Sequence, residues 1–287
     1  MQPSESERGQ RWLSNFNNVD QPAARLLIDS LELVSESRFR SGLQKLIEKL
    51  PSKIETPIGL VPVRELGTSR GYFSLANRDA KPQLLLSNSF PGSEAIVANI
   101  ASSIRRGAGK SGPFVASPSL RNLRLAKART ILYVDDFSGS GNRIVTFHKK
   151  FCFHPTIRSW RSYKLIDFHI AAYSMTREAY DILTRTFGKK NVHTVNICQT
   201  FDGQPWQFDQ GLQIEAICKK YSRNPEFSLG FNNSKALTAF AHTAPNNLPA
   251  ILWQARSTGL PWHSFFRERP CQWTSSSCST LQVAQRN

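Results

Sequence analysis

Short apolar runs alternate with amphipathic stretches along the middle of this chain, and this alternation constrains the fold more than any other feature. The runs IGLVPV, QLLLSNS, GPFVAS, TILYV, IDFHIAAYSM and NVHTVNIC are predicted strands. Between some of them, SEAIVANIASSIRR, NRIVTFHKKF and TREAYDILTRTF carry apolar residues at helical spacing, and Ser93 is expected to cap the first of these helices. Strands that alternate with helices form βαβ units, so the sequence predicts an α/β fold with a largely parallel sheet.

Two regions flank this α/β core. Residues 1–20 are polar and are predicted to be frayed, whereas apolar residues of 21–34 and 38–50 recur at helical spacing, with Pro51 ending the second helix. KALTAFAH, near the other end, is predicted to be a further strand. We therefore divide the chain into an N-terminal helical region (1–52), an α/β domain with a C-terminal extension (53–270) and a polar, disordered tail (271–287).

The chain carries a large excess of positive charge. The formal net charge of +16 favours a polyanionic partner or substrate, although a merely solvated basic surface is the simpler alternative. Between Ala95 and Val134 there is no acidic residue, yet that span carries several arginines and lysines. Because the block ends at an acidic pair, we expect part of it to form a basic rim around a site: Arg105, Arg106, Lys110, Arg121 and Arg124.

The sequence gives no indication of a membrane segment. No apolar run reaches the roughly 18 residues that a membrane span needs. The first residues, MQPSESERGQRW, lack the apolar core of a signal peptide. We therefore expect a cytoplasmic protein that has no membrane partner.

The stretch TILYVDDFSGSGNRI places two acids at the end of the clearest strand. Ligands of an open parallel sheet bind beyond the carboxyl ends of its strands, so Asp135 and Asp136 are expected to lie at a site. The small residues that follow lead into a predicted helix, whose first amide groups and dipole favour an anion. Carboxylates for sugar hydroxyls beside a phosphate-binding turn fit a ribose 5-phosphate. A capped helix behind solvated acids is the alternative interpretation.

The same stretch resembles the signature of type I phosphoribosyltransferases, in which an apolar strand leads to two acids and a small-residue phosphate loop. The resemblance implies that Asp135 and Asp136 hold the ribose hydroxyls of phosphoribosyl pyrophosphate or another nucleotide. It also implies that the 5-phosphate is bound by Ser138, Gly139, Ser140, Gly141, Asn142 and Arg143. Asn142 and Arg143 replace residues that are usually small or hydroxylic, and Arg143 would either contact the phosphate or obstruct it.

Two further segments are similar to a narrower group of phosphoribosyltransferase-like proteins. AARLLIDSLELVSESRFRSGLQKLIEKL resembles the paired helices that precede the core of that group, and HTAPNNLPAILW resembles its C-terminal motif. The group consists of predicted effectors of bacterial conflict and antiphage defence systems, often encoded beside ATPases or retron components. The resemblance, which spans residues 21–253, therefore implies an ATPase, or a reverse transcriptase with its nucleic acid, as partner.

The loop SNSFPGSEA follows a predicted strand and opens a helix. In this class of fold the matching loop contacts pyrophosphate, and Ser89, Gly92 and Ser93 could do so with backbone and hydroxyl donors. An ordinary turn with a serine cap is the alternative.

A turn that follows KALTAFA supplies the last candidates. If that strand is parallel, His242, Asn246 and Asn247 would face the ligand. The asparagines could contact a base or ribose, and the histidine could act as an acid or base. Paired asparagines are equally typical of a structural turn, and a lone histidine is more often a structural group.

The leading function is therefore a toxic or regulated effector of a prokaryotic antiphage defence system that acts on a ribosyl-phosphate compound or nucleotide. The reaction would be glycosyl transfer, or cleavage of an N-glycosidic or pyrophosphate-linked bond. Bound Mg²⁺ is a candidate cofactor that would stabilise the leaving pyrophosphate, but no residues are assigned as metal ligands. The alternative is a non-catalytic module that senses a nucleotide and binds nucleic acid or a defence-complex partner. An ordinary salvage transferase is a third possibility.

Overall fold

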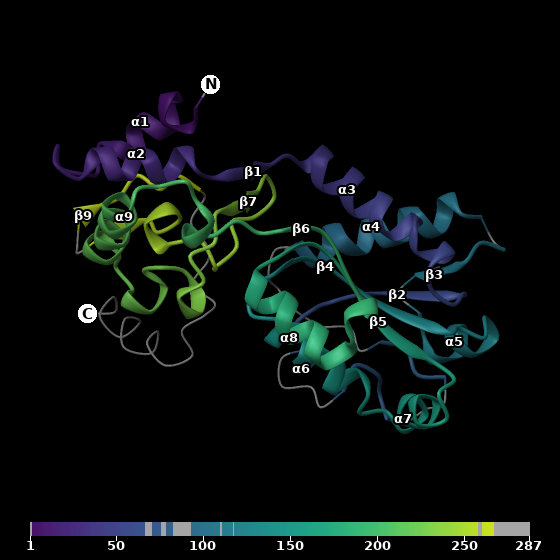
Figure 1. Ribbon diagram of the computed structural model, residues 1–287. Coiled ribbons are helices and arrows are strands. Elements are labelled where there is room, and N and C mark those ends of the chain that lie inside the picture. Colours follow the sequence, from purple (N-terminus) through teal and green to yellow (C-terminus); the bar gives the residue numbers. More distant parts are fainter. Residues whose placement is uncertain are drawn as a thin grey trace, which may run out of the picture.

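A five-stranded parallel sheet, in the order β3-β2-β4-β5-β6, forms the centre of the molecule (Figure 1). The computed structural model describes residues 2–66, 71–75, 79–82, 93–109, 111–116, 118–257 and 260–266. The strands are β2 (Ile58–Pro62), β3 (Phe114–Ala116), β4 (Thr130–Ser138), β5 (Asp167–Met175) and β6 (Val192–Ile197). The α/β prediction is thus confirmed. Of the predicted strands, QLLLSNS lies outside the described residues.

Helices cover both faces of the sheet, and β4 shows why its sequence is apolar throughout. Ile131 and Tyr133 point into the core shared with α5 to α8, whereas Leu132 and Val134 point into the core shared with α3 and α4. Successive side chains of a strand face opposite sides, so a strand covered on both faces has no exposed position to fill with polar residues. The helices are α3 (Glu36–Glu48), α4 (Ser93–Gly107), α5 (Leu120–Leu125), α6 (Asn142–Phe151), α7 (Pro155–Ser162) and α8 (Arg177–Phe187).

A second body beside the sheet is built from both ends of the chain (Figure 1). Trp12 is fully buried in its core, and the indole Nε1–H donates a hydrogen bond of 2.8 Å to the carbonyl oxygen of Ile251. Its elements are η1 (Pro3–Glu5), α1 (Glu7–Leu13), α2 (Gln21–Asp29), α9 (Phe208–Tyr221) and η7 (Ala250–Leu252). A two-stranded parallel pair of β1 (Glu32–Val34) and β7 (Thr238–Phe240) accompanies them, and the described chain ends with β8 (Arg256–Ser257) and β9 (Leu260–Pro261).

Two predictions for the ends of the chain were wrong. Residues 2–20 are not frayed, because apolar residues of α1 pack against distant C-terminal segments. The helix predicted over 21–34 ends at Asp29, since Glu32–Val34 pairs with β7 instead. The strand predicted in KALTAFAH is confirmed as β7, which pairs parallel with β1 outside the central sheet.

The packing also divides the region 1–52. The helices α1 and α2 belong to the second body, whereas α3 lies on the sheet. The predicted polar tail, 271–287, lies outside the described residues. Within the described part of the chain, no helix has both the length and the apolar character that crossing a bilayer requires.

Candidate functional site

The acidic pair lies near the carboxyl end of β4, in the middle of the sheet, where the sequence placed it. The strand continues through Asp135 and Asp136 to Ser138, and the two acids are only 2 % and 3 % exposed. Gly141 then adopts a left-handed conformation, with φ of 73°, and α6 begins at Asn142. A side chain rarely adopts this conformation, so glycine lets the chain turn from strand to helix here.

Arg143 and His242 contact the two carboxylates. The Nη2 of Arg143 donates to Oδ1 of Asp135 and lies 3.5 Å from Oδ1 of Asp136. The Nε2 of His242 lies 3.4 Å from the other oxygen of Asp136. Within the described structure, Oδ2 of Asp135 is buried and has no hydrogen-bond partner. Three of the four carboxylate oxygens therefore already face a nitrogen atom.

Burial and these contacts move the pKa values of the two acids apart. Burial raises the pKa of Asp135 to about 8, although the nearby Arg143 charge opposes the rise. Burial also disfavours the charged form of Asp136, but the His242 contact and the Arg143 charge hold the pKa of Asp136 below its usual value. Burial opposes the charge of Arg143 as well, yet the two acids raise the pKa of this guanidinium. At neutral pH, Asp136 is therefore ionised while Asp135 mostly keeps its proton.

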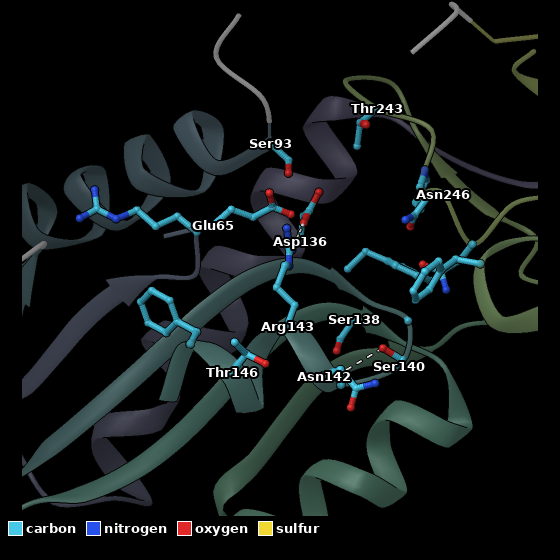
Figure 2. Close-up of a pocket in the computed structure, with 18 of the residues that line it drawn as sticks. Glu65, Ser93, Asp136, Ser138, Ser140, Asn142, Arg143, Thr146, Thr243 and Asn246 are labelled. Carbon is cyan, nitrogen blue, oxygen red and sulfur yellow. Dashed lines mark hydrogen bonds and ion pairs between the residues drawn. The ribbon is translucent and has the colours of Figure 1, made fainter. Parts of the chain in front are cut away.

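A cleft of about 500 Å³ opens over the acidic pair. Asp136 lines it together with the whole loop 138–143, and Ser93 at the start of α4 and Asn246 face it from other sides (Figure 2). Figure 2 shows Arg143 reaching from the first turn of α6 toward Asp136 in the middle of the cleft. Asp135 does not line the cleft, but it contacts Arg143, which does. The structure thus gathers most of the predicted candidates at one place.

The loop is held from behind by the second body and by α8. The hydroxyl of Thr176, the residue that caps α8, donates to the carbonyl oxygen of Gly139. Asn247 packs so closely against Gly139 that a Cβ atom at position 139 would overlap with the amide group of Asn247. Asn247 is also buried. Both predicted asparagines therefore line the cleft, but Asn247 is buried against the loop and supports it, whereas Asn246 is the less buried of the two.

The predicted basic rim does not line the cleft. Arg105 and Arg106 lie in the last turn of α4, the opposite end from Ser93. Arg121 and Arg124 lie in α5, directly before β4, and so near the amino end of the sheet. The chain of a βαβ unit returns through its helix to the start of the next strand, which carries these residues away from the carboxyl ends. Lys110, Ser89 and Gly92 lie outside the described residues.

Several cleft residues escaped the sequence analysis. Thr146 and Lys150 follow Asn142 at four-residue steps on α6, so the helical period could have identified them. Arg64 and Glu65 come directly after β2, at the same edge of the sheet as the acids. Across the described part of the chain, no three His, Cys, Asp or Glu side chains gather as a metal site.

The chain is similar to a known family along most of its length. The family model PRTase-CE matches residues 10–268 of the 287 residues and so covers the sheet, the second body and the cleft. No curated protein matches the chain. The match confirms the resemblance that TILYVDDFSGSGNRI suggested, and it extends that resemblance over both bodies. The chain belongs to the PRTase-CE family of phosphoribosyltransferase-like proteins.

Proposed function

We propose that the cleft binds a ribosyl-phosphate compound, either phosphoribosyl pyrophosphate or another nucleotide. One observation carries the proposal: Asp136, one of the two buried acids, and the start of α6 line the same cleft of about 500 Å³. The first amide groups and dipole of α6 would bind the 5-phosphate beside Ser138 and Ser140. The carboxylates would accept hydrogen bonds from the ribose hydroxyls.

Arg143 must change partners for such a ligand to bind. Its guanidinium occupies the carboxylate oxygens that the hydroxyls would need. Because Arg143 stands in the first turn of α6, it lies beside the loop that would hold the phosphate. In our proposal the hydroxyls replace Arg143 on the acids, and the guanidinium turns to the phosphate. The positive charge then remains in the cleft and offsets the charge of the ligand.

Mg²⁺ does not fit the acidic pair in this arrangement. Mg²⁺ requires near-octahedral oxygen ligands and usually keeps several waters. Here three carboxylate oxygens face nitrogen atoms of Arg143 or His242, and the fourth is buried. We therefore assign no step to Mg²⁺. The positive charge facing a leaving pyrophosphate would come from the other cationic side chains that line the cleft, Arg64 and Lys150.

The proposed reaction is glycosyl transfer, or cleavage of an N-glycosidic or pyrophosphate-linked bond. At the biological level we propose an effector of a prokaryotic antiphage defence system, acting with an ATPase or with a reverse transcriptase and its nucleic acid. The similarity of residues 21–253 to effectors of bacterial conflict systems supports this role. Membership of the PRTase-CE family supports the ribosyl-phosphate chemistry.

The contacts of the Arg143 guanidinium with both acids favour a second candidate function, a non-catalytic nucleotide sensor. In such a module the ligand displaces Arg143, and the consequence is a changed conformation without turnover. The buried contact of His242 with Asp136 would transmit the change, because His242 belongs to the segment that follows β7 of the second body. The module would then bind nucleic acid or a defence-complex partner.

One experiment separates the two functions. The purified protein is incubated with phosphoribosyl pyrophosphate, NAD, nucleotides and tRNA, and the products are identified by mass spectrometry. Release of pyrophosphate, nicotinamide or a free base would establish an enzyme. Binding in a calorimeter without any product would establish a sensor. Failure of every one of these compounds to bind or react would refute the ribosyl-phosphate proposal.

The double variant Asp135→Asn with Asp136→Asn tests the roles of the acids. A lost charge-assisted hydrogen bond to Asp136 is worth roughly 1.5–3 kcal/mol and a bond to the mostly protonated Asp135 about 1 kcal/mol, so binding should weaken about thirtyfold or more. Glu178→Gln with Asp181→Asn, on the exposed side of α8, replaces two acids by their amides outside the cleft and should leave binding unchanged. Circular dichroism would verify folding. Equal binding by the wild type and the folded acid-pair variant would contradict the assignment.

A further inference from the structure

Two adjoining hollows lie at the amino end of the sheet, away from the candidate site. One, of about 560 Å³, is lined by Thr130 and Asp167, the first residues of β4 and β5. The other, of about 740 Å³, lies on α7 and its C-terminal turn. Arg161 lines both hollows and so joins them into one surface. None of these residues lines the cleft, and Figure 1 shows α7 at the far side of the sheet from α1 and α9.

The first hollow has an excess of positive charge. Its cationic side chains are Lys53, Arg129, Arg161, Lys164 and Lys190. Its two acids are already engaged: Glu55 lies 3.0 Å from Nε of Arg129, and Asp167 lies 3.5 Å from Nε2 of His169. Among the residues that the structure describes, the other four cations have no carboxylate within 4.0 Å. Burial lowers the pKa values of His148 and His169, so these two lining histidines add little charge at neutral pH.

An exposed aromatic ring stands among these cations. Tyr163 is 75 % exposed and lines the second hollow together with Arg158 and Arg161. Lys164 follows it and lines the first hollow. A positively charged groove combined with exposed aromatic rings is typical of surfaces that bind single strands. There the cations contact phosphates, and bases stack on the ring.

The helix α5 continues this surface. The guanidinium of Arg124 lies 5.9 Å from the ring centroid of Trp160 on α7, and it also pairs with Asp79 at 2.9 Å. Arg121 and Lys127 are exposed on the same segment. Part of the acid-free block of the sequence therefore contributes to the amino end of the sheet.

We infer that this surface, composed of α7, its C-terminal turn and the adjoining basic hollow, binds single-stranded nucleic acid. The sugar–phosphate backbone runs over Arg158, Arg161 and Lys164, and a base stacks on Tyr163. A duplex keeps its base faces stacked inside and would leave the ring unused, whereas an acidic peptide would use only the charges. The inference does not depend on the function proposed for the cleft, because the two surfaces share no lining residue.

Fluorescence anisotropy with labelled single strands of about 20 nucleotides, DNA and RNA, tests the inference against the matching duplex. The wild type should bind a single strand more tightly than the duplex. Arg161→Glu with Lys164→Glu should weaken single-strand binding at least tenfold. Loss of two phosphate contacts should also lower the slope of log K against log salt by about 1.4, measured between about 50 and 200 mM salt. Arg8→Glu with Lys45→Glu, exposed on α1 and α3, makes the same change in net charge and should leave binding unchanged.

A second pair of variants tests the stacking. Tyr163→Ala should weaken single-strand binding by about tenfold or more and leave duplex binding unchanged, whereas Tyr163→Phe should bind like the wild type. Circular dichroism and urea unfolding would show that the variants are folded. The inference is overturned if the wild type prefers the duplex or binds no single strand at low salt. It is equally overturned if the folded Tyr163→Ala variant binds like the wild type, or if the control pair weakens binding as much as the Arg161 and Lys164 pair.

Discussion

Asp135→Asn is expected to remove a pH dependence of stability that the wild type has around neutrality. In the unfolded chain the carboxyl of Asp135 has its ordinary pKa of 3.8, and in the folded protein burial raises the pKa to about 8. Between these two values the folded state binds a proton that the unfolded state has lost. Stability due to this group is therefore present at low pH and declines as the pH rises toward and through the folded pKa.

The size of the effect follows from the folded pKa. While the folded group is fully protonated, stability falls by about 1.4 kcal/mol for each pH unit. Because deprotonation begins below the pKa of about 8, the summed loss between about pH 6 and pH 8 is about 2 kcal/mol. Asparagine keeps the size of the side chain and an oxygen for the contact with Arg143, but it has no such proton. The variant should therefore gain stability relative to the wild type over this range.

Urea unfolding followed by tryptophan fluorescence, at three pH values across this range, would measure the difference. Histidines titrate in both proteins, so the difference between the two curves isolates Asp135. Asp136→Asn is the matched control. The pKa of Asp136 is depressed, so its stabilising charge is present throughout this range, and its loss should destabilise the protein at each pH. Parallel stability curves for the wild type and Asp135→Asn would refute the account of the buried pair.

Three further variants test the surroundings of the pair. Arg143→Gln should destabilise the protein by less than the roughly 3–5 kcal/mol of a fully buried pair, because the arginine side chain is 36 % exposed. It should also permit Mn²⁺ binding, detected by electron paramagnetic resonance, and no binding would contradict the argument against Mg²⁺. Gly139→Ala should cost about 1–3 kcal/mol in urea unfolding, and adding Asn247→Ala should recover part of it; no recovery would mean that Asn247 does not support the loop. Trp12→Ala should lower unfolding free energy by about 3–5 kcal/mol, and unchanged stability would show that the second body contributes little to the fold.

The sequence predicted the central sheet well because the signals for it are local. A few neighbouring residues suffice to predict each strand or helix there, as the apolar run TILYV and the helical spacing after it show. The second body depends on contacts between the two ends of the chain. Trp12 stands in a polar segment, and its partner, the carbonyl of Ile251, is 239 residues away. No local pattern encodes such a contact, so α1 and the pairing of β1 with β7 could not be predicted.

The candidate site also has a part that local sequence predicted and a part that depends on the fold. Asp135, Asp136 and the loop form one continuous stretch, so the motif alone located them. The direction of the Arg143 side chain could not be foreseen, because it depends on how the acids are buried and on which charges lie nearby. Contrary to what the sequence had suggested, the basic block does not line the site, for a physical reason. Neighbours in sequence lie at opposite ends of a sheet when a strand or helix separates them, as β4 separates Arg124 from Asp135.

The support that Asn247 gives to Gly139 has a consequence for biosynthesis. About a hundred residues separate the two positions, so the loop leaves the ribosome well before its support. At about 5–20 residues per second, Asn247 follows roughly 5–20 s later. During this interval the strands of the sheet can pair and Thr176 can reach Gly139, but the loop still lacks its contact with Asn247. A nascent chain, or a product truncated before Asn247, would thus have a folded sheet and a loop with only part of its support, and the cleft is complete only after Asn247 has been synthesised.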